Sequence, residues 1–263
     1  MNVPREDATA AGAPGPGKLL VVNAVAPALW VTCGRPGQDV VHRRAEATGR
    51  CAEVLAPLIA EVLAEAGVTP AELGGVACVR GPGSFTGIRV ALATALGLSL
   101  GANVPMAGLD YLPLLAATAA AKATGAVVAI THARTGQVYL QSFLADGDLM
   151  PMGAPKALTV AEAAAQAADG AAVGPLWLVG DGVARYRDAF LAAAPLAAIL
   201  GPEYDSPSPA ALLAAAASAS YGFAPVEPLY LRPSDAEENL DAIAANRGLT
   251  RHEAEVRIRQ AME

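Results

Sequence analysis

The chain has few of the side chains that build metal sites and disulfide frameworks. Its 263 residues include only three cysteines and three histidines. An odd number of cysteines without paired spacing argues against a disulfide scaffold or a zinc knuckle and predicts reduced thiols. The histidines form no H-x-x-H or H-x-x-x-H pattern, so a metal site built from this chain alone is not expected. These residues are Cys33, Cys51, Cys78, His42, His132 and His252.

Long uninterrupted apolar runs are also missing. Hydrophobic residues make up 54% of the chain, but much of this fraction is alanine, and the best candidate run, residues 112–130, is interrupted by Lys122 and Gly125. This pattern predicts a buried helix followed by a strand rather than a membrane span. Residues 1–17 contain two acids and no apolar core, so they do not resemble a secretory signal. A cytoplasmic location is therefore expected.

Basic charge is scarce as well. The net charge is −7 and the pI is near 5.0. A protein that binds nucleic acid by itself needs a basic surface to displace counterions from the phosphates. If this chain serves RNA, we expect another protein to hold the RNA.

What is present is the pattern of an α/β protein. Apolar runs between turn signals predict strands, and apolar residues at helical spacing predict the helices that follow them. Strands are expected at 18–23, 29–33, from 40, 76–79, 104–109, 126–130, 137–143 and 177–179, with an extended segment at 225–231. Helices are expected at 49–66, 84–101, 111–122, 159–168, 183–194 and 210–221.

This order predicts two α/β subdomains. The first covers 18–110 with a return segment at about 210–232, and the second covers 111–209. Residues 1–17, rich in alanine, glycine and proline, are expected to form a disordered leader. Residues 233–263 form a charged tail, in which a helix from Thr250 to Met262 is predicted; its charged residues include Arg251, Glu255, Arg257 and Arg259.

The most informative stretch is Gly81-Pro82-Gly83-Ser84-Phe85-Thr86-Gly87-Ile88-Arg89. It joins a predicted strand to a long predicted helix, with glycines for the turn and Ser84 as a good N-cap. Free amides at a helix N-terminus are a general anion-binding geometry, so both a phosphate cradle and a well-capped turn fit. The turn is favoured because the Gly-Lys-Ser/Thr ending of a P-loop is absent.

The whole nonapeptide resembles the signature of the TsaB (YeaZ) family. Further matches follow in family order: Leu55-Ala56-Pro57-Leu58-Ile59, Ala133-Arg134 with Val138-Tyr139, Gly180-Asp181-Gly182 and Tyr230-Leu231-Arg232. The resemblance covers roughly residues 18–232. It implies an actin/Hsp70-like (ASKHA, RNase H-like) fold with two subdomains, each a mixed sheet flanked by helices. It also implies a non-catalytic scaffold subunit that supports N6-threonylcarbamoylation of the adenosine next to the tRNA anticodon.

The same resemblance implies the partners. A TsaD-like catalytic subunit is expected to bind the chain and to carry ATP and metal, and a TsaE-like ATPase is expected in the complex. No cofactor is expected in the isolated subunit, tRNA is expected only through the complex, and the chain alone is a candidate homodimer. The alternative is a degenerate enzyme of this fold that binds a small phosphorylated ligand at Gly81–Gly87.

Asn23 separates these two hypotheses. Relatives of this fold that use ATP place an acid at the end of the first strand, followed by hydroxyl and glycine residues. Here Asn23 is followed by Ala24-Val25-Ala26-Pro27, which offers nothing to balance the charge of a magnesium ion. The loop therefore favours the scaffold.

The residue pattern of the predicted helix from Ser84 to Gly101 indicates how the chain binds its partner. The helix has a bulky arc and an arc of small residues, and neither is polar. One sheet covers only one face of this helix, so we expect the other face to pack against a second helix. Helix 49–66 is expected to be its neighbour within the chain. Which of the two faces meets the partner is left open. The predicted partner interface comprises Leu55, Leu58, Ile59, Val62, Ser84, Phe85, Thr86, Gly87, Arg89, Val90, Ala93 and Gly97.

Four further polar residues have competing interpretations. Asp181 is either a phosphate-loop acid or, as we favour, an aspartate that bonds the amides of its own turn. His132 with Arg134 suggests a general base, but no nucleophile elbow accompanies them. We expect Arg134 to fix a hairpin or a subunit contact, and Arg89 to be either a packing stem or a partner contact.

Overall fold

The computed structural model describes residues 12–26, 28–46, 49–120 and 122–233, together with Ala244, Thr250, Glu253 and Val256. Contacts divide the chain into two units, Met1–Leu229 and Tyr230–Glu263. In the second unit, the amide of Thr250 donates to Glu253 Oε2 at 2.8 Å, and the amide of Glu253 donates to Thr250 Oγ1 at 3.3 Å. This is a capping box at the predicted start of the tail helix. The rest of that predicted helix lies outside the described residues.

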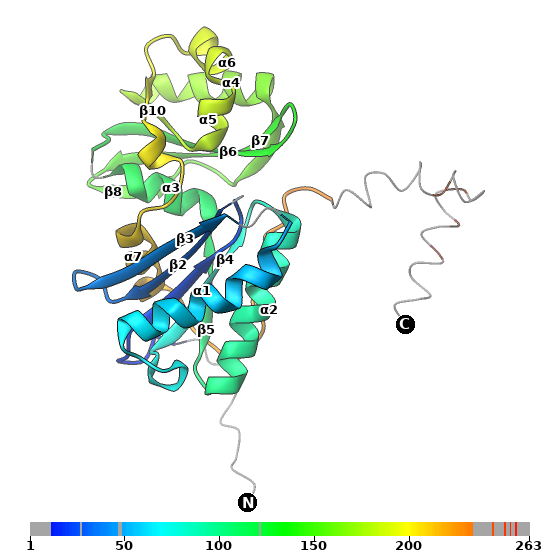
Figure 1. Cartoon of the computed structure of the whole chain (residues 1–263). Helices are drawn as coiled ribbons and strands as arrows, with labels where there is room; N and C mark the ends of the chain where they lie inside the picture. Colours follow the sequence, from blue (N-terminus) through cyan, green and yellow to red (C-terminus); the bar gives the residue numbers. More distant parts are fainter. Residues whose placement is uncertain are drawn as a thin grey trace, which may run out of the picture. The chain divides into compact units, whose positions relative to one another are not determined.

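The first unit contains two sheets (Figure 1). Sheet I has the order β3-β2-β1-β4-β5. Strands β1, β2 and β3 pair antiparallel, whereas β4 pairs parallel with both β1 and β5. The strands are β1 (Leu19–Asn23), β2 (Ala28–Gly34), β3 (Val40–Glu46), β4 (Gly75–Gly81) and β5 (Met106–Asp110).

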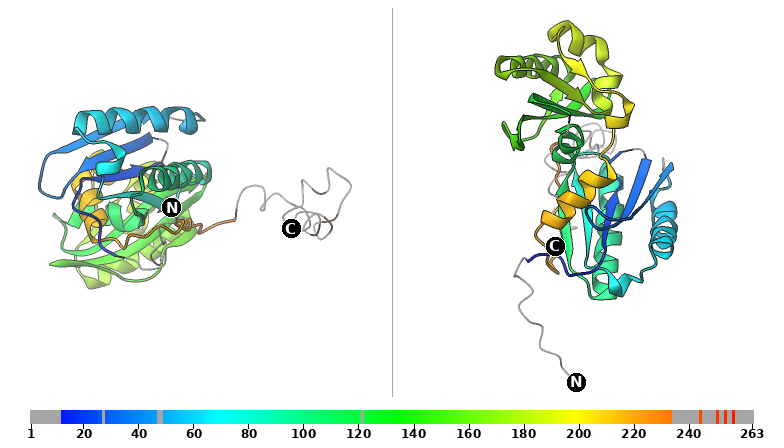
Figure 2. Two further views of the ribbon diagram at one scale, coloured as in Figure 1. Left: turned by 90° about the horizontal axis from the view of Figure 1, so that it is seen from below. Right: turned by 90° about the vertical axis from the view of Figure 1, so that its left-hand side faces the viewer.

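Helices cover both faces of sheet I. Helices α1 (Cys51–Ala66) and α2 (Phe85–Ala102) lie on one face, and α7 (Pro209–Ser218) lies on the other (Figure 2). Successive side chains of a strand point to opposite faces of the sheet, so the apolar strands of sheet I have side chains to bury on both faces. Leu20 and Val22 are fully buried in the core beneath α1 and α2.

Sheet II has the order β11-β10-β6-β7-β8, and β9 also pairs with β7. Helix α3 (Tyr111–Ala120) packs against strands of both sheets and against α7. The strands are β6 (Gly125–Arg134), β7 (Gln137–Asp146), β8 (Asp148–Pro151), β9 (Lys156–Thr159), β10 (Leu176–Val179) and β11 (Ala198–Ile199). The remaining helices are α4 (Val160–Asp169), α5 (Asp181–Arg185) and α6 (Arg187–Ala193), with short 3-10 turns at Pro70–Glu72, Gly170–Val173 and Pro202–Tyr204.

The two sheets repeat one topology. In each, the first strand of an antiparallel hairpin, β1–β2 or β6–β7, pairs in parallel with a later strand, β4 or β10. That strand pairs in parallel with the last strand, β5 or β11. Two such sheets flanked by helices form the actin/Hsp70-like α/β arrangement, so the predicted fold class is confirmed.

Several local features differ from the prediction. The helix expected at 183–194 is broken at Tyr186 into α5 and α6, and β8 and β9 were not predicted. Residues 12–17 were assigned to a disordered leader, but Gly12 exchanges two backbone hydrogen bonds with Tyr221, and the amide of Gly15 donates to Gly74. Because these backbone hydrogen bonds hold Gly12 and Gly15 in place, the assignment of a leader to residue 17 was too long. Its remaining part, residues 1–11, lies outside the described residues.

Candidate partner-binding site

The signature loop packs against the turn that follows β1. The amide of Ser84 donates to the carbonyl of Val25 at 2.7 Å, and Ser84 Oγ accepts from the amide of Gly87 at 3.2 Å, as an N-cap does. A Cβ added at Gly83 would collide with the backbone of Val25, and one added at Gly87 would collide with the carbonyl oxygen of Ala24. Two glycines of the signature therefore serve a close approach between two backbones.

Asn23 supports the same turn. The residue is 1% exposed, and its Oδ1 accepts a hydrogen bond from the amide of Val25 at 3.2 Å. A neutral amide in this role supplies no charge to a metal-bound nucleotide. The residues present at this turn therefore do not fit ATP with magnesium. Pro27, which entered the same prediction, lies outside the described residues.

Helix α2 turns one stripe of small residues inward, to sheet I, and another stripe of small residues outward. Ile88, Ala91 and Ala95 are fully buried against the sheet. A Cβ added at Gly97 or Gly101 would meet nothing within 4 Å, so these positions are open. The exposed positions of the helix are Thr86, Arg89, Ala93, Gly97, Leu100 and Gly101.

Length and composition alone would also allow α2 to cross a membrane. Among the helices of the described ranges, it is the one that meets both criteria. In the sequence, residues 112–130 were taken as the best candidate for a membrane span, and the segment that forms α2 was overlooked. A helix that packs on a sheet meets the same criteria, and α2 packs on β4 of sheet I.

Helix α1 lies beside α2, as expected, but its predicted contact residues face the protein core. Leu55, Leu58, Ile59 and Val62 are between 0% and 7% exposed and belong to the core beneath sheet I. Their bulky apolar side chains pack against the sheet, because burial there removes the largest apolar area from water. The inclusion of these four residues in a partner interface was therefore wrong.

The outward side of α1 was missed by the sequence analysis. Its exposed residues include Ala52, Ala56 and Ala60, which recur at one helical turn. That spacing was visible in the sequence, but alanine contributes little to an apolar pattern. We define the α1–α2 surface as the outward small residues of both helices: Ala52, Ala56, Ala60, Thr86, Ala93, Gly97 and Gly101.

The other predicted interface residues lie near the N-terminal end of α2. Ser84 is exposed, Phe85 and Val90 are half-buried, and Gly87 is buried against the turn after β1. Arg89 lies with its guanidinium carbon 3.8 Å from the centre of the Phe85 ring. This cation–π contact holds the arginine stem on the helix and leaves the residue exposed.

Asp181 fastens α5 to the end of β6. Its Oδ1 accepts from Thr131 Oγ1 at 2.6 Å and from the amide of His132 at 3.1 Å. The expectation that Asp181 bonds the amides of its own turn was therefore wrong, because its two donors belong to strand β6. Burial and the nearby Arg185 lower the pKa of His132, while Asp181 acts in the opposite direction.

Arg134 stabilises the β6–β7 hairpin. Its Nε donates to Gln137 Oε1 at 3.1 Å, across the hairpin turn. Tyr186 reaches the same turn, where its hydroxyl oxygen accepts from the amide of Gly136 at 2.9 Å. These two bonds fix the hairpin turn against Tyr186, the residue between α5 and α6.

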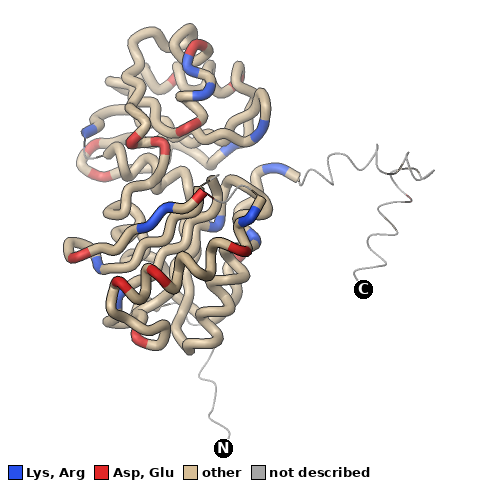
Figure 3. Tube along the Cα trace, viewed as in Figure 1, with Lys and Arg blue, Asp and Glu red and all other residues tan. Residues whose placement is uncertain are grey.

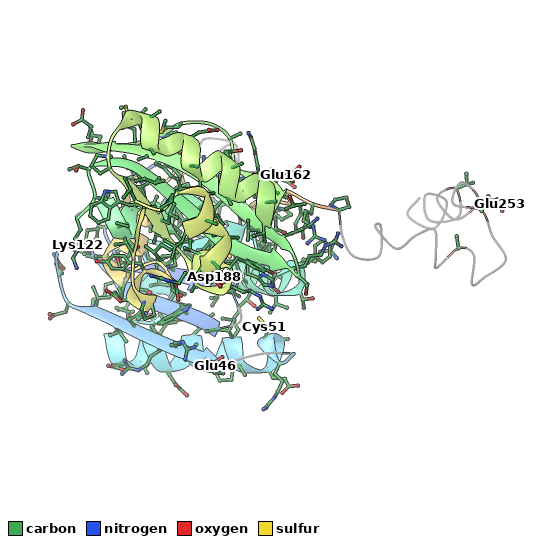
Figure 4. All side chains as sticks on the ribbon, turned by 90° about the horizontal axis from the view of Figure 1, so that it is seen from above. Glu46, Cys51, Lys122, Glu162, Asp188 and Glu253 are labelled. Carbon is green, nitrogen blue, oxygen red and sulfur yellow. The ribbon has the colours of Figure 1, made fainter. Side chains whose placement is uncertain are left out.

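A cavity of about 480 Å³ lies where four segments meet. These are the turn after β1, the N-terminal ends of α1 and α2, and the β6–β7 hairpin. Cys51, labelled in Figure 4, lines it, and burial raises the pKa of its thiol. The lining residues are Ala24, Val25, Ala26, Leu29, Gly49, Cys51, Ala52, Ser84, Thr86, Gly87, Val90, His132 and Ala133.

The cysteines and the other side chains that can bind metal ions are arranged as follows. Within the described residues, no group of three or more histidine, cysteine, aspartate or glutamate side chains is placed to hold a metal ion. The cysteines are all described and all free, and two of them, Cys33 and Cys78, are fully buried. Burial raises the pKa of Cys33 to about 11, so this thiol stays protonated near neutral pH.

Comparison with known proteins covers most of the first unit. The family profile described as "TsaD: tRNA N6-adenosine threonylcarbamoyltransferase" matches residues 45–239, more than half of the chain. A protein of Escherichia coli named tRNA threonylcarbamoyladenosine biosynthesis protein TsaB is 39% identical over 92 residues, which cover 34% of this chain and 39% of that protein. A Buchnera aphidicola protein of the same name is 37% identical over 98 residues, which cover 37% and 47%. The chain thus aligns with less than half the length of these relatives.

Solved structures extend the likeness to nearly all of the fold. YeaZ from Pseudomonas aeruginosa superposes with a TM-score of 0.66 at 24% identity, and the superposition covers 82% of this chain and 100% of that one. At this identity the match demonstrates a shared fold. It agrees with the two repeated sheets described above.

Proposed function

Because the chain belongs to the TsaD family and, within it, to the TsaB (YeaZ) group, we propose that it is a non-catalytic scaffold subunit in the synthesis of threonylcarbamoyladenosine in tRNA. The α1–α2 surface binds a TsaD-like catalytic protein in the cytoplasm. That partner carries ATP, metal and most of the RNA contact, and a TsaE-like ATPase joins the complex. Alone, the chain pairs with a second copy through the same surface.

The observation that carries this proposal is the outward face of α2 beyond Arg89, which carries no charge. Residues 90–102 contain no charged side chain, although Ala93, Gly97 and Gly101 are exposed. A helix on the surface of a protein normally turns charged and polar residues to water. Exposed small residues instead allow the backbone of another helix to approach closely, and Leu100, 63% exposed, adds apolar area. Co-purification with a TsaD-like protein of the same cell, followed by an assay of the modified nucleoside, tests the proposal.

The alternative, a degenerate enzyme with a phosphate site at Gly81–Gly87, is not favoured by the geometry. Ser84 Oγ already accepts from Gly87, and the amide of Ser84 already donates to Val25. These groups are therefore not available to hold a phosphate. Calorimetric titration of the isolated chain with ATP and magnesium distinguishes the two functions.

We expect the isolated chain neither to hydrolyse ATP nor to form threonylcarbamoyladenosine. The reason is that Asn23 supports a turn instead of a metal. Asn23→Asp should not create activity, because the hydroxyl and glycine residues that would hold phosphate are missing from that turn. The measurement is phosphate release and nucleoside analysis across the purification peak, and turnover that follows the protein peak would contradict the proposal.

Transfer RNA should bind the isolated chain weakly and without sequence preference. A net charge of −7 leaves little basic surface to displace counterions from the phosphates. The measurement is a gel shift at physiological salt, with and without the TsaD-like partner. A sub-micromolar midpoint for the lone chain, with preference for one tRNA, would be incompatible with a scaffold that reaches RNA through its partner.

A further inference from the structure

Two stretches of chain join sheet I to sheet II. Helix α3 leads from β5 to β6, and residues 200–208 lead from β11 back to α7, which packs on sheet I. We call residues 200–208 the connector; its 3-10 turn contacts both α3 and α5. Its end is held on α3, because Thr118 Oγ1 accepts from the amide of Ser208 at 2.9 Å. The contacts of the connector therefore influence how firmly the two sheets are held together.

Asp205 places a half-buried carboxyl in the connector. Within the described residues it forms no ion pair. Helices α3 and α7, which flank the connector, contain no charged residue, so neither has a red or blue segment in Figure 3. Lys122, just beyond α3, lies instead over the ring of Tyr204, with its Nζ 5.5 Å from the ring centre. No cation of the flanking helices therefore balances a carboxylate at position 205.

A second carboxyl acts on Asp205 from α5. Asp181 begins that helix, and its Oδ1 accepts from Thr131 Oγ1 at 2.6 Å and from the amide of His132 at 3.1 Å. These two donors hold the carboxyl of Asp181 in place. Burial and the charges of Asp181 and Glu203 together raise the pKa of Asp205 from its usual 3.8 to about 6. The connector thus carries an acid that is costly to ionise.

Tyr111 shows that the two aspartates share one region. It is 1% exposed at the start of α3, and its hydroxyl donates to the backbone carbonyl of Asp205 at 3.5 Å. Burial, followed by the charge of Asp181, raises the pKa of Tyr111, and the charge of Asp205 acts in the same direction. The titratable groups that face Asp205 are therefore Asp181 on α5, Glu203 on the 3-10 turn and Tyr111 on α3, and none of them supplies a positive charge.

We propose that Asp181 and Asp205 form a pH-dependent contact that holds the connector against α5 while Asp205 is protonated and loosens it when both carboxyls are charged. The proton is exchanged with water. An unfolded chain loses it near pH 4, whereas the folded chain keeps it to about pH 6, so the folded state loses stability as the pH rises between these values. Above this range the repulsion is fully present, and the connector opens more readily than the rest of the fold.

Asp205→Asn tests the proposal, because it removes the charge and keeps the size of the side chain. Its melting temperature is compared with that of the unsubstituted chain at about pH 4 and about pH 7.5, on the two sides of the expected transition. The variant should melt about 2–4 °C higher at the upper pH and within about 1 °C at the lower pH. Asp188→Asn is the matched control, because Asp188 is an exposed aspartate on α6, labelled in Figure 4; this variant should show no such difference.

Hydrogen exchange at about pH 7.5 locates the effect within the fold. The amides of Tyr204 and Ser208 donate to Gly201 and Thr118, and they should exchange more slowly in Asp205→Asn than in the unsubstituted chain. The amides of α1 should not change. Unchanged exchange in the connector would contradict its release, even if the melting temperature rises.

Asp181→Asn separates repulsion from burial. Its amide oxygen can still accept from Thr131, and the variant removes the same repulsion from the other side. It should therefore raise the melting temperature at neutral pH, and Asp205→Asn should add little to it. Equal melting temperatures of the single variants and the unsubstituted chain, or the same gain at both pH values, would overturn the proposal. A gain from Asp205→Asn that persists in full beside Asp181→Asn would also overturn it, because burial alone would then be the cause.

Discussion

Ala93→Glu is expected to abolish association with a TsaD-like partner, and tRNA modification with it, while the chain stays folded. Ala93 is exposed near the middle of α2, between the open positions Gly97 and Gly101 and the first turn of the helix. Glutamate is a good helix former, so α2 should tolerate it. In a close helix-to-helix contact, however, its charge would be buried without a partner, which costs several kcal/mol.

This cost corresponds to a loss of affinity of at least about 100-fold. The measurement is calorimetry with the purified partner, accompanied by a thermal melt of the variant. Ala165→Glu is the matched control, because Ala165 is an exposed alanine on helix α4 of the other sheet; this variant should bind normally. Normal binding by Ala93→Glu would contradict the docking surface, and loss of its cooperative melt would contradict the outward orientation of the small residues.

Gly87→Ala and Gly97→Ala are expected to change stability in opposite directions. The methyl group at position 87 would meet the carbonyl oxygen of Ala24, so the two backbones must move apart at a cost of about 1–3 kcal/mol. Position 97 lies in the interior of the helix, and a methyl group there would meet no atom of its surroundings within 4 Å. Gly97→Ala should therefore raise the free energy of unfolding by about 0.5–1 kcal/mol, because alanine has the higher helix propensity. Both variants keep the same backbone hydrogen-bonding groups.

Urea denaturation of the unsubstituted chain and of the two variants measures the differences in the free energy of unfolding. Gly97→Ala serves as the internal control, because both changes add one methyl group to the same helix. A neutral Gly87→Ala would mean that the signature loop does not need its close approach to the turn after β1. The glycines would then require another explanation, and the phosphate-site alternative would regain support.

Local chemistry explains which features the sequence predicted correctly. Ser84 caps α2, as predicted. The sequence carries two more signals of this local kind, a capping box of Thr159 and Glu162 at α4 and Gly67, which ends α1 in the left-handed region with φ of 66°. Each of these signals is satisfied within a few residues of the chain, so neighbouring sequence is sufficient to detect it. The alternation of strands and helices is local in the same sense, and it led to the correct α/β class, whereas the actin/Hsp70-like arrangement was implied by the family resemblance.

The tertiary structure decided what depends on distant partners. Both faces of α2 are apolar, so periodicity could not tell which one packs; the contact of Ala91 and Ala95 with sheet I did. The same packing buried the predicted interface residues of α1 and turned its alanines outward. Asp181 finds its donors on β6, about 50 positions earlier in the chain.

The cavity is the clearest case of this division. It exists only because the turn after β1, the starts of two helices and the tip of a hairpin from the other sheet converge. No periodicity or spacing in one segment records that convergence, because the contacts that bring the segments together, such as the hydrogen bond from the amide of Ser84 to the carbonyl of Val25, join residues far apart in the chain. The sequence by itself determined most of the elements and the caps that end several of them, and the packing of two sheets around α3 determined which side chains meet.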